Sequence, residues 1–398
     1  MTPEIKQRIE QIRRGEVPEG YKKGKLGVVP EEWEETSFSS LFTSTSDYTD
    51  DLEKYPLYSL TIEDGVTPKT ERYERSHLVK KEDSYKIVRP NDYAYNPMNL
   101  RFGSVARHKG NSPVAVSGYY DIFTTVHKSD LPFMDSFLTC DPMITYYNRV
   151  STGSLVEKQR VHFSQFLEFV LPLPAINERA KIAAILTTQD KVIELKEKRL
   201  AEKQRQKKYL MQQLLTGKKR LPGFSKEWKS VRLRNTLNVC HGQNQRNVEQ
   251  ENGVYPILGT GGEIGRTNDF LYDKPCILIG RKGSINKPMY METPFWTIDT
   301  LFYCKIKSGY HPKFLFFKFQ SINWNKYDES SGVPSLNAST IGSVDIFAPE
   351  FPEQTAIAEV LSAADREIDL LRQDIEQEKQ KKKALMQLLF TGIARVKT

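Results

Sequence analysis

Apolar residues recur every seven positions in two long stretches of the chain, 178–220 and 353–395. The recurring positions are Leu186, Ile193, Leu200, Lys207 and Leu214 in the first stretch, and Leu361, Ile368, Ile375, Lys382 and Leu389 in the second. A second row runs from Ile182 to Leu210 and from Ile357 to Leu385, and is mostly polar between these ends. Since a heptad repeat places such rows along one seam of a helix, the pattern predicts a two-helix coiled coil whose interior polar residues define its register.

The two stretches are copies of one sequence. At a constant offset of 175 residues they align without a gap, and 16 of the 43 aligned positions carry the same residue. Each copy ends in a glycine, Gly217 or Gly392, which favours a helix C-terminus there. We expect Asn177 to cap the first helix and Pro352 to occupy the first position of the second. The run at 187–189, Thr-Thr-Gln, has poor helix propensity and predicts a break in the first copy.

The two blocks between these stretches, 27–176 and 221–351, show the alternation and turn residues of short strands. Both blocks open with Glu-Trp, at 32–33 and 227–228, and both close on a short apolar strand that ends in proline. They therefore predict two diverged copies of one domain. The fold class expected is α+β, with two similar domains of short twisted strands plus helices, separated by two long helices packed as an antiparallel coiled coil with pseudo-twofold symmetry.

The segment before the first block completes this arrangement. KGKLGVVPEEW (23–33) is similar to TGKKRLPGFSKEW (216–228), so the chain begins about where its second half begins. We expect a circular repeat with the two termini close together. The predicted parts are an N-terminal segment at 1–26, a first domain at 27–176, a central helix at 177–220, a second domain at 221–351 and a C-terminal helix at 352–398.

Charge and composition narrow the function classes only slightly. Lys plus Arg number 58 against 50 acidic residues, which gives a net charge of +8 and a pI near 9.0. This excess fits a nucleic-acid partner but also fits many other proteins. The sequence contains no run of about 18 apolar residues, so no membrane span is predicted. The N-terminus also lacks the apolar region of a secretory signal. The four cysteines are scattered without metal-ligand spacing, so no metal site is expected.

At this point the chain resembles the specificity (S) subunit of type I restriction–modification systems. The resemblance rests on PAINERAKIAAILTTQD (174–190) and PEFPEQTAIAEVLSAAD (349–365), together with the repeated endings LMQQLLTG (210–217) and LMQLLFTG (385–392). It covers essentially the whole chain. The two blocks would then be the family's target-recognition domains. The first helix reads Ile-Asn-Glu-Arg where the second reads Phe-Pro-Glu-Gln, so we expect the first methyltransferase contact to differ slightly.

The resemblance implies a DNA-recognition subunit without catalytic residues of its own. Each domain would read one half of a bipartite site in double-stranded DNA, and the helices would set the spacer between the halves. Two methyltransferase subunits would bind the helical regions and use S-adenosylmethionine, and a restriction subunit would use ATP and Mg²⁺. The expected location is the bacterial or archaeal cytoplasm. The residues expected to pair the helices or bind partners are Glu178, Ile182, Leu186, Ile193, Leu200, Leu210, Leu214, Glu353, Ile357, Leu361, Ile368, Ile375, Leu385 and Leu389.

Three loops carry the side chains that read base edges, namely Arg or Lys for guanine, Asn or Gln for adenine, and Ser or Thr for either. Two of them, YNPMNLRFGSVARHKG (95–110) and GRKGSINK (280–287), occupy equivalent places in the two blocks. The third is HGQNQRN (241–247). The candidate DNA-contacting residues are Tyr95, Asn96, Asn99, Arg101, Arg107, Lys109, Gln243, Asn244, Arg246, Arg281, Lys282, Ser284, Asn286 and Lys287.

No segment predicts catalysis within the chain. GTGGEIG (259–265) looks like a nucleotide loop but has the wrong spacing and no following helix, so we interpret it as a Gly-rich turn. Asn96-Pro97-Met98 lacks the second proline and the aromatic residue of a methyltransferase corner. Two alternatives stay open beside DNA recognition: a coiled-coil scaffold with protein-binding domains, and a self-contained methyltransferase or nuclease, which the missing motifs disfavour.

Overall fold

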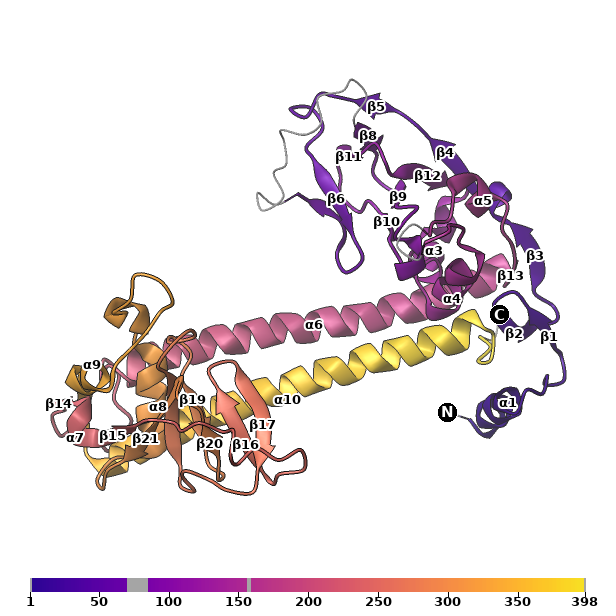
Figure 1. Ribbon diagram of the computed structural model, residues 1–398. Helices are drawn as coiled ribbons and strands as arrows, with labels where there is room; N and C mark the ends of the chain where they lie inside the picture. The colour runs from indigo at the N-terminus through magenta and orange to yellow at the C-terminus, as the bar shows by residue number, and fades with distance from the viewer. Residues whose placement is uncertain (1, 70–84, 156–158, 397–398) are drawn as a thin grey trace. The chain divides into compact units, whose positions relative to one another are not determined.

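The computed structural model describes residues 2–69, 85–155 and 159–396, and these form two compact units (Figure 1). Unit 1 comprises Met1–Leu195 and Ile375–Thr398, and unit 2 comprises Lys196–Asp374. Two long helices, α6 (Ile176–Leu214) and α10 (Phe351–Phe390), each contribute one part to either unit. The heptad stretches are therefore helical, as their periodicity predicts.

Unit 1 is built from short strands around a four-stranded sheet of order β10-β9-β12-β4 and a three-stranded sheet of order β11-β8-β5. Its strands are β1 (Tyr21–Gly24), β2 (Gly27–Pro30), β3 (Glu34–Ser37), β4 (Phe42–Thr45), β5 (Tyr48–Thr49), β6 (Tyr58–Thr61), β7 (Gly65–Pro68), β8 (Tyr85–Val88), β9 (Tyr93–Tyr95), β10 (Val105–Arg107), β11 (Val114–Ser117), β12 (Asp121–Thr125) and β13 (Val170–Leu173). Its short helices are α1 (Pro3–Arg13), α2 (Phe38–Leu41), η2 (Leu100–Phe102), η3 (Lys128–Asp130), α3 (Leu131–Phe137), α4 (Asp141–Val150) and α5 (Phe163–Leu167).

Unit 2 has a four-stranded sheet of order β15-β21-β18-β19 and a three-stranded sheet of order β17-β16-β20. Its strands are β14 (Lys229–Arg232), β15 (Leu237–Cys240), β16 (Tyr255–Gly259), β17 (Gly262–Thr267), β18 (Cys276–Gly280), β19 (Met289–Met291), β20 (Trp296–Thr297), β21 (Leu301–Ile306) and β22 (Asp345–Ala348). Its short helices are α7 (Leu233–Thr236), α8 (Pro312–Ser321), η5 (Trp324–Tyr327) and α9 (Ala338–Ser343).

The two units repeat one topology. In both four-stranded sheets the first strand lies at one edge and pairs antiparallel with the last (β4 with β12, β15 with β21), and a one-turn helix precedes that first strand (α2 or α7). In both units the strand before this helix pairs antiparallel with the strand that leads into the long helix, β3 with β13 and β14 with β22. The α+β fold class with two similar domains and two long helices is thus confirmed.

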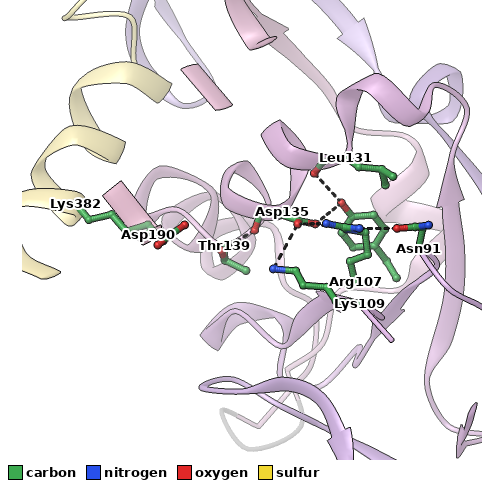
Figure 2. A network of polar contacts seen from close by, with 9 residues as sticks. Asn91, Arg107, Lys109, Leu131, Asp135, Thr139, Asp190 and Lys382 are labelled. Atoms are coloured by element: carbon green, nitrogen blue, oxygen red, sulfur yellow. Dashed lines mark hydrogen bonds and ion pairs between the residues drawn. The ribbon is translucent and has the colours of Figure 1, made fainter. Parts of the chain in front are cut away.

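The long helices run antiparallel and make reciprocal contacts. In unit 2, Lys207 of α6 forms an ion pair with Asp365 of α10. In unit 1 the equivalent pair joins Lys382 of α10 and Asp190 of α6, with 2.5 Å between Nζ and Oδ1 (Figure 2). Each of these residues lies 175 positions from its counterpart, so the same contact is made twice with the helices exchanged. Such reciprocity is the signature of a twofold relation, and it confirms the antiparallel pseudo-twofold pairing.

Polar residues in the middle of the seam select one register. Lys196 contacts Asp374 at 2.7 Å and Lys203 contacts Glu367 at 2.9 Å, both between the helices. Gln189, 7% exposed, donates to the Glu378 carboxylate at 2.6 Å. A shift of one turn would separate these partners, so the polar positions specify alignment while the apolar ones contribute burial.

Three predictions about the helix ends and continuity are wrong. Residues 187–189 do not break α6, because Thr188 donates its hydroxyl to the Ala184 carbonyl at 2.8 Å and Gln189 is held by the facing helix. Asn177 does not cap α6, since the helix already begins at Ile176. Likewise α10 begins at Phe351, which places Pro352 at its second position.

One of the positions that differ between the helix starts, Arg179 in α6 and Gln354 in α10, lies inside its own unit. Arg179 is 9% exposed and donates Nε to the Pro174 carbonyl at 2.8 Å. Gln354, its counterpart in α10, is 1% exposed and donates Nε2 to the Pro349 carbonyl at 2.9 Å. Both side chains therefore hold the proline carbonyl that precedes the helix. At this position the sequence difference is one of internal packing. Ile176 and Phe351, which also differ between the copies, are 52% and 46% exposed, so the expected difference between the two partner contacts stays a prediction.

A Trp–Glu–Arg cluster closes the start of α6 in unit 1. The carboxylate of Glu178, 2% exposed, accepts hydrogen bonds from Arg395 at 2.8 and 2.9 Å. The indole Nε1 of Trp33 donates to the same carboxylate at 3.3 Å. Nearby, the hydroxyl of Tyr21 donates to the Gly392 carbonyl at 2.8 Å. Segments near both ends of the chain therefore pack together within this unit.

Unit 2 builds the same cluster from the equivalent residues. Glu353, 3% exposed, accepts from the Arg220 guanidinium at 2.6 and 2.7 Å. Trp228 Nε1 donates to Glu353 at 3.3 Å. The repeated Glu-Trp near the start of each block thus marks the tryptophan that meets the first turn of a long helix. Glu178 and Glu353 were expected to serve the helix pair or partners, and the structure uses both carboxylates internally.

Lys318 of α8 is a buried cation at the end of α6. It is 7% exposed, its ammonium donates to the Leu215 carbonyl, and it lies 5.2 Å from the centre of the Trp228 ring. Burial lowers the pKa of Lys318 from its ordinary 10.5 to about 8. Between these two values the unfolded chain holds a proton that the folded chain has released, so the free energy of unfolding rises with pH across this window.

Replacing Lys318 with methionine is expected to remove that rise. The difference in free energy of unfolding between wild type and Lys318→Met should change by on the order of 3 kcal/mol between pH 7.5 and pH 10.5. Urea unfolding at both pH values measures it, with the exposed Lys326→Met as the matched control. An unchanged pH dependence in Lys318→Met would contradict this account of the buried ammonium.

Candidate nucleic-acid interface

The first predicted loop of unit 1 divides into buried and exposed residues. Tyr95 is fully buried in strand β9, and its hydroxyl donates to the Val161 carbonyl at 2.5 Å. Asn96 is 8% exposed and accepts the Met98 N–H at 3.1 Å, which forms a turn. Both are part of the interior, and we remove them from the candidate contacts. All three residues of β9 are buried, and Asn96 is the buried residue that follows the strand.

The remaining residues of this loop reach solvent to different degrees. Asn99 and Lys109 are exposed, whereas Arg101 is half-buried. Arg101 donates to the Gln159 carboxamide at 3.3 Å, and its guanidinium lies 4.4 Å from the centre of the Phe102 ring. Its contacts leave the side chain near the surface, so Arg101 stays a candidate together with Asn99 and Lys109.

Arg107 is held in a polar network rather than directed to solvent (Figure 2). Its Nε and Nη2 atoms donate to the two carboxylate oxygens of Asp135 at 2.9 and 2.7 Å, and Nη1 donates to Asn91. Tyr93 donates to Asp135 at 2.8 Å, and Lys109 approaches the same carboxylate at 3.5 Å. All three guanidinium nitrogens of Arg107 have hydrogen-bond partners, so this side chain holds the loop in place. Lys109 is then the exposed cation of this part of the loop.

The electrostatics of Asp135 agree with this role. Burial pushes the pKa of Asp135 upward, but the hydrogen bonds from Arg107 and Tyr93 and the charge of Lys109 outweigh it, so the pKa lies below its ordinary value. Burial, with Asp135 beside it, raises the pKa of Tyr93 far above its usual range. Asp135 is therefore ionised and Tyr93 neutral near pH 7, which keeps the network a fixed donor–acceptor set.

A recess of about 380 Å³ lies beside this network. One wall is the 105–110 segment with Lys109, and the other is the turn of the β6–β7 hairpin with Ile62 and Glu63. Asp135 and Thr139 contribute the remaining side from α3 and the residues after it. The loop predicted from the sequence is thus joined by a hairpin that was not predicted as part of the site.

In unit 2 the second predicted loop makes the equivalent contact. The backbone of Gly283, at φ +89°, packs so that an added Cβ would lie 3.5 Å from the hydroxyl of Thr260, at the tip of the β16–β17 hairpin. Lys282, Ser284 and Lys287 are exposed on this loop. Each unit therefore brings a basic loop and a hairpin tip together.

Other candidates of unit 2 have mixed roles. Arg281 is half-buried and donates to the Asp299 carbonyl at 3.3 Å. Asn286 accepts the Trp324 N–H at 2.8 Å, so its side chain supports the loop. In the third loop Gln243, Asn244 and Arg246 are all exposed. These three stay candidate contacts.

The two hairpins share a sequence signal that the comparison of the basic loops did not reveal. Tyr55-Pro56 lies just before β6, and Tyr255-Pro256 begins β16, 200 residues later. Glu63 and Glu263 are separated by the same 200 residues. This offset differs from the 175 residues that relate the helices, because the blocks have unequal lengths. A search at one offset therefore overlooks the pair.

Residues 225–380 match a family described as the type I restriction modification DNA specificity domain. The chain is 26% identical to the putative type I restriction enzyme MjaX specificity subunit of Methanocaldococcus jannaschii, over 96% of this chain and 98% of that protein. The structure is similar to the S subunit of a type I restriction-modification system from M. genitalium, with a TM-score of 0.58 and 16% identity over 90% of this chain and 96% of that one. Over nearly its whole length the chain is thus similar to type I restriction–modification specificity subunits, and residues 225–380 match the family model itself.

A second relative of this chain is the type I restriction enzyme MjaVIII specificity subunit of the same archaeon, 26% identical over 58% of this chain and 64% of that protein. Both relatives are named as specificity subunits, and the matched family is described as a DNA specificity domain. The GTGGEIG segment forms the turn of the β16–β17 hairpin and its flanking strand ends, as the turn interpretation predicted.

The seam residues of the specificity subunit fall into two groups. At the helix ends, the predicted residues pack into the core of one unit, and they are Ile182, Leu186, Leu214, Ile357, Leu361 and Leu389. Nearer the middle, Ile193, Ile368 and Ile375 are buried along the helices themselves. Leu200, Leu210 and Leu385 are half-buried. The helices are thus anchored by domain cores at their ends and by a narrower seam between.

Within residues 2–69, 85–155 and 159–396 no group of three or more His, Cys, Asp or Glu side chains is placed to hold a metal ion. Burial raises the pKa of the Cys140 and Cys276 thiols to about 12, so both are protonated near neutral pH. No helix among these residues is both long and apolar enough to cross a bilayer.

Proposed function

We propose that each unit of this specificity subunit reads one half of a bipartite, asymmetric site in double-stranded DNA. The observation that carries the proposal is that one fold occurs twice, each time with an exposed basic loop of different sequence. In unit 1 the loop offers Asn99 and Lys109, and in unit 2 it offers Lys282, Ser284 and Lys287. Different side chains on the same scaffold read different base edges, so the two half-sites differ.

The helix pair would set the spacer and dock the partners. Its reciprocal ion pairs give two equivalent helical surfaces, which supports the binding of two copies of one methyltransferase subunit. A restriction subunit would complete the complex. S-adenosylmethionine would belong to the methyltransferase, and ATP and Mg²⁺ to the restriction subunit, in a bacterial or archaeal cytoplasm.

A base-resolution methylome of cells that co-express this chain with its cognate adenine methyltransferase tests the proposal. We expect methylation at a bipartite motif with a fixed gap, present only when this chain is expressed. Absence of any motif while the two proteins co-purify would favour a scaffold instead. Failure to co-purify would contradict the proposed methyltransferase docking.

Arg281→Ala is expected to reduce methylation by roughly 10-fold or more, because one arginine contact to a base contributes about 1–3 kcal/mol. Arg281 lies in the basic loop of unit 2, next to the hairpin tip. Methylation rates of the purified complex on the cognate duplex measure the effect. Lys229→Ala, an exposed position on β14, is the matched control and should leave the rate unchanged. Equal rates for both variants would exclude Arg281 as a DNA contact.

A further inference from the structure

Each unit projects one β-hairpin whose outer part exposes an isoleucine beside a glutamate. In unit 1, β6–β7 presents Ile62, 56% exposed, and Glu63. In unit 2, β16–β17 presents Ile264, 49% exposed, and Glu263. A large apolar side chain in water is an unfavourable arrangement that a partner surface would relieve, and each hairpin carries one, in the turn of β6–β7 and in strand β17.

Both hairpins are held rigidly at their bases. In unit 1, Leu60 and its cross-strand neighbour Val66 pack in an apolar cluster, and Gly65 closes the turn at φ +70°. In unit 2, Ile257 and Leu258 are buried, and the ladder shifts register between them, which bulges Ile264 outward. The buried residues therefore fix the backbone of each hairpin, so that its outer part is already formed before DNA binds.

The hairpins lie against the basic loops. An added Cβ at Gly65 would approach the Ala106 side chain within 3.1 Å, which places β7 directly on β10. The recess of unit 1 is shared by Glu63 and Lys109. In unit 2, the contact between Gly283 and Thr260 places Lys282 next to the other tip. A cation that can neutralise phosphate thus stands beside each apolar and acidic tip.

We propose that these two hairpins are further base-reading elements beside the basic loops, and that each enters the major groove of its half-site. The proposal rests on the proposed function above. The major groove of B-DNA is wide enough for a two-stranded β-ribbon. Phosphates repel a carboxylate and offer nothing to an isoleucine, whereas groove floors offer amino groups that donate to carboxylates and thymine methyl groups that contact aliphatic side chains. The neighbouring lysines then contact the phosphates at the groove edge.

The two tips differ in a way that produces an asymmetric site. Glu63 has no hydrogen-bond or ion-pair partner among the described residues, so its carboxylate is available to accept from the amino group of cytosine. Glu263 instead accepts from Arg266 Nε at 2.9 Å, and the Arg266 side chain stays 48% exposed. The acidic residue of unit 2 therefore orients an arginine, which is the side chain that pairs with guanine.

The test is the methylome of the co-expressed complex carrying Glu63→Gln or Arg266→Gln. Each variant should change the base preferred at one or two positions of a single half-site by roughly 10- to 100-fold, and the two variants should affect different halves. Matched controls are Glu53→Gln and Arg234→Gln, exposed residues outside the hairpins, which should leave the motif unaltered. If melting shows that either variant has lost its fold, Ile62→Ala or Ile264→Ala at the same tip replaces it.

Three results would overturn the inference. An unchanged motif in folded variants would exclude the hairpins from base reading. A uniform drop in methylation without a change in base preference would assign the side chains to phosphate contacts. A change from only one hairpin would overturn the inference for the other unit. A wild-type chain that directs no motif at all would instead refute the proposed function, so the two failures are distinguishable.

Discussion

Replacing Glu353 with alanine is expected to lower the free energy of unfolding of unit 2 by about 3 kcal/mol. The carboxylate is 3% exposed and accepts hydrogen bonds from both Arg220 and Trp228. Its removal leaves the Arg220 guanidinium and the Trp228 indole N–H, both partly buried, without their acceptor. Groups left unpaired in this way account for most of the penalty when one partner of such a pair is deleted.

Tryptophan fluorescence during urea unfolding measures this effect, because Trp228 reports on the altered site directly. The matched control is Glu350→Ala. Glu350 pairs with Lys226 at the surface, 56% exposed, so its loss should change stability by less than about 1 kcal/mol. Glu178→Ala makes the equivalent deletion in unit 1 and should have a similar effect there. Equal stabilities of Glu353→Ala and Glu350→Ala would contradict the structural role of the cluster.

Lengthening both long helices by four residues is expected to change the DNA spacer. Four residues add about 6 Å to a helix, and base pairs rise about 3.4 Å each, so the gap between half-sites should grow by one to two base pairs. The insertions belong after Arg199 in α6 and after Leu370 in α10, between the facing pairs Lys196–Asp374 and Lys203–Glu367. Inserting in both helices keeps these ion pairs facing each other.

The methylome of cells that express the double insertion measures the result. We expect both half-sites to keep their sequences while the number of unspecified bases between them increases. Gln373→Ala, an exposed substitution in α10 that changes no length, should keep the original gap. An unaltered gap in the folded insertion variant would exclude the helices as the determinant of the spacer.

Much of the architecture could be predicted because it is encoded locally. A heptad repeat can be recognised in the sequence because neighbours on one helix face lie only three or four residues apart. The duplication can be recognised because the two copies align at a constant offset. The predicted break at 187–189 failed for the opposite reason. Low propensity is a local quantity, whereas Gln189 is held by Glu378 from the other helix.

The candidate site was only partly predictable. Composition correctly drew attention to loops that lie at the surface, such as the segment with Lys282. It also nominated Tyr95 and Arg107, whose polar ends are occupied by the Val161 carbonyl and by Asp135. Nothing in the neighbouring sequence announces those partners, because they lie 66 and 28 residues away along the chain.

The sequence by itself determined the family resemblance, the two similar domains and the helix pair, because periodicity and repetition are properties of residue order. Only the tertiary structure decided which side chains are free to meet DNA. It placed Glu178 and Glu353 inside Trp–Glu–Arg clusters and set a hairpin beside each basic loop. The physical reason is that exposure and hydrogen-bond pairing depend on contacts between residues far apart in the chain, which burial creates and residue order does not display.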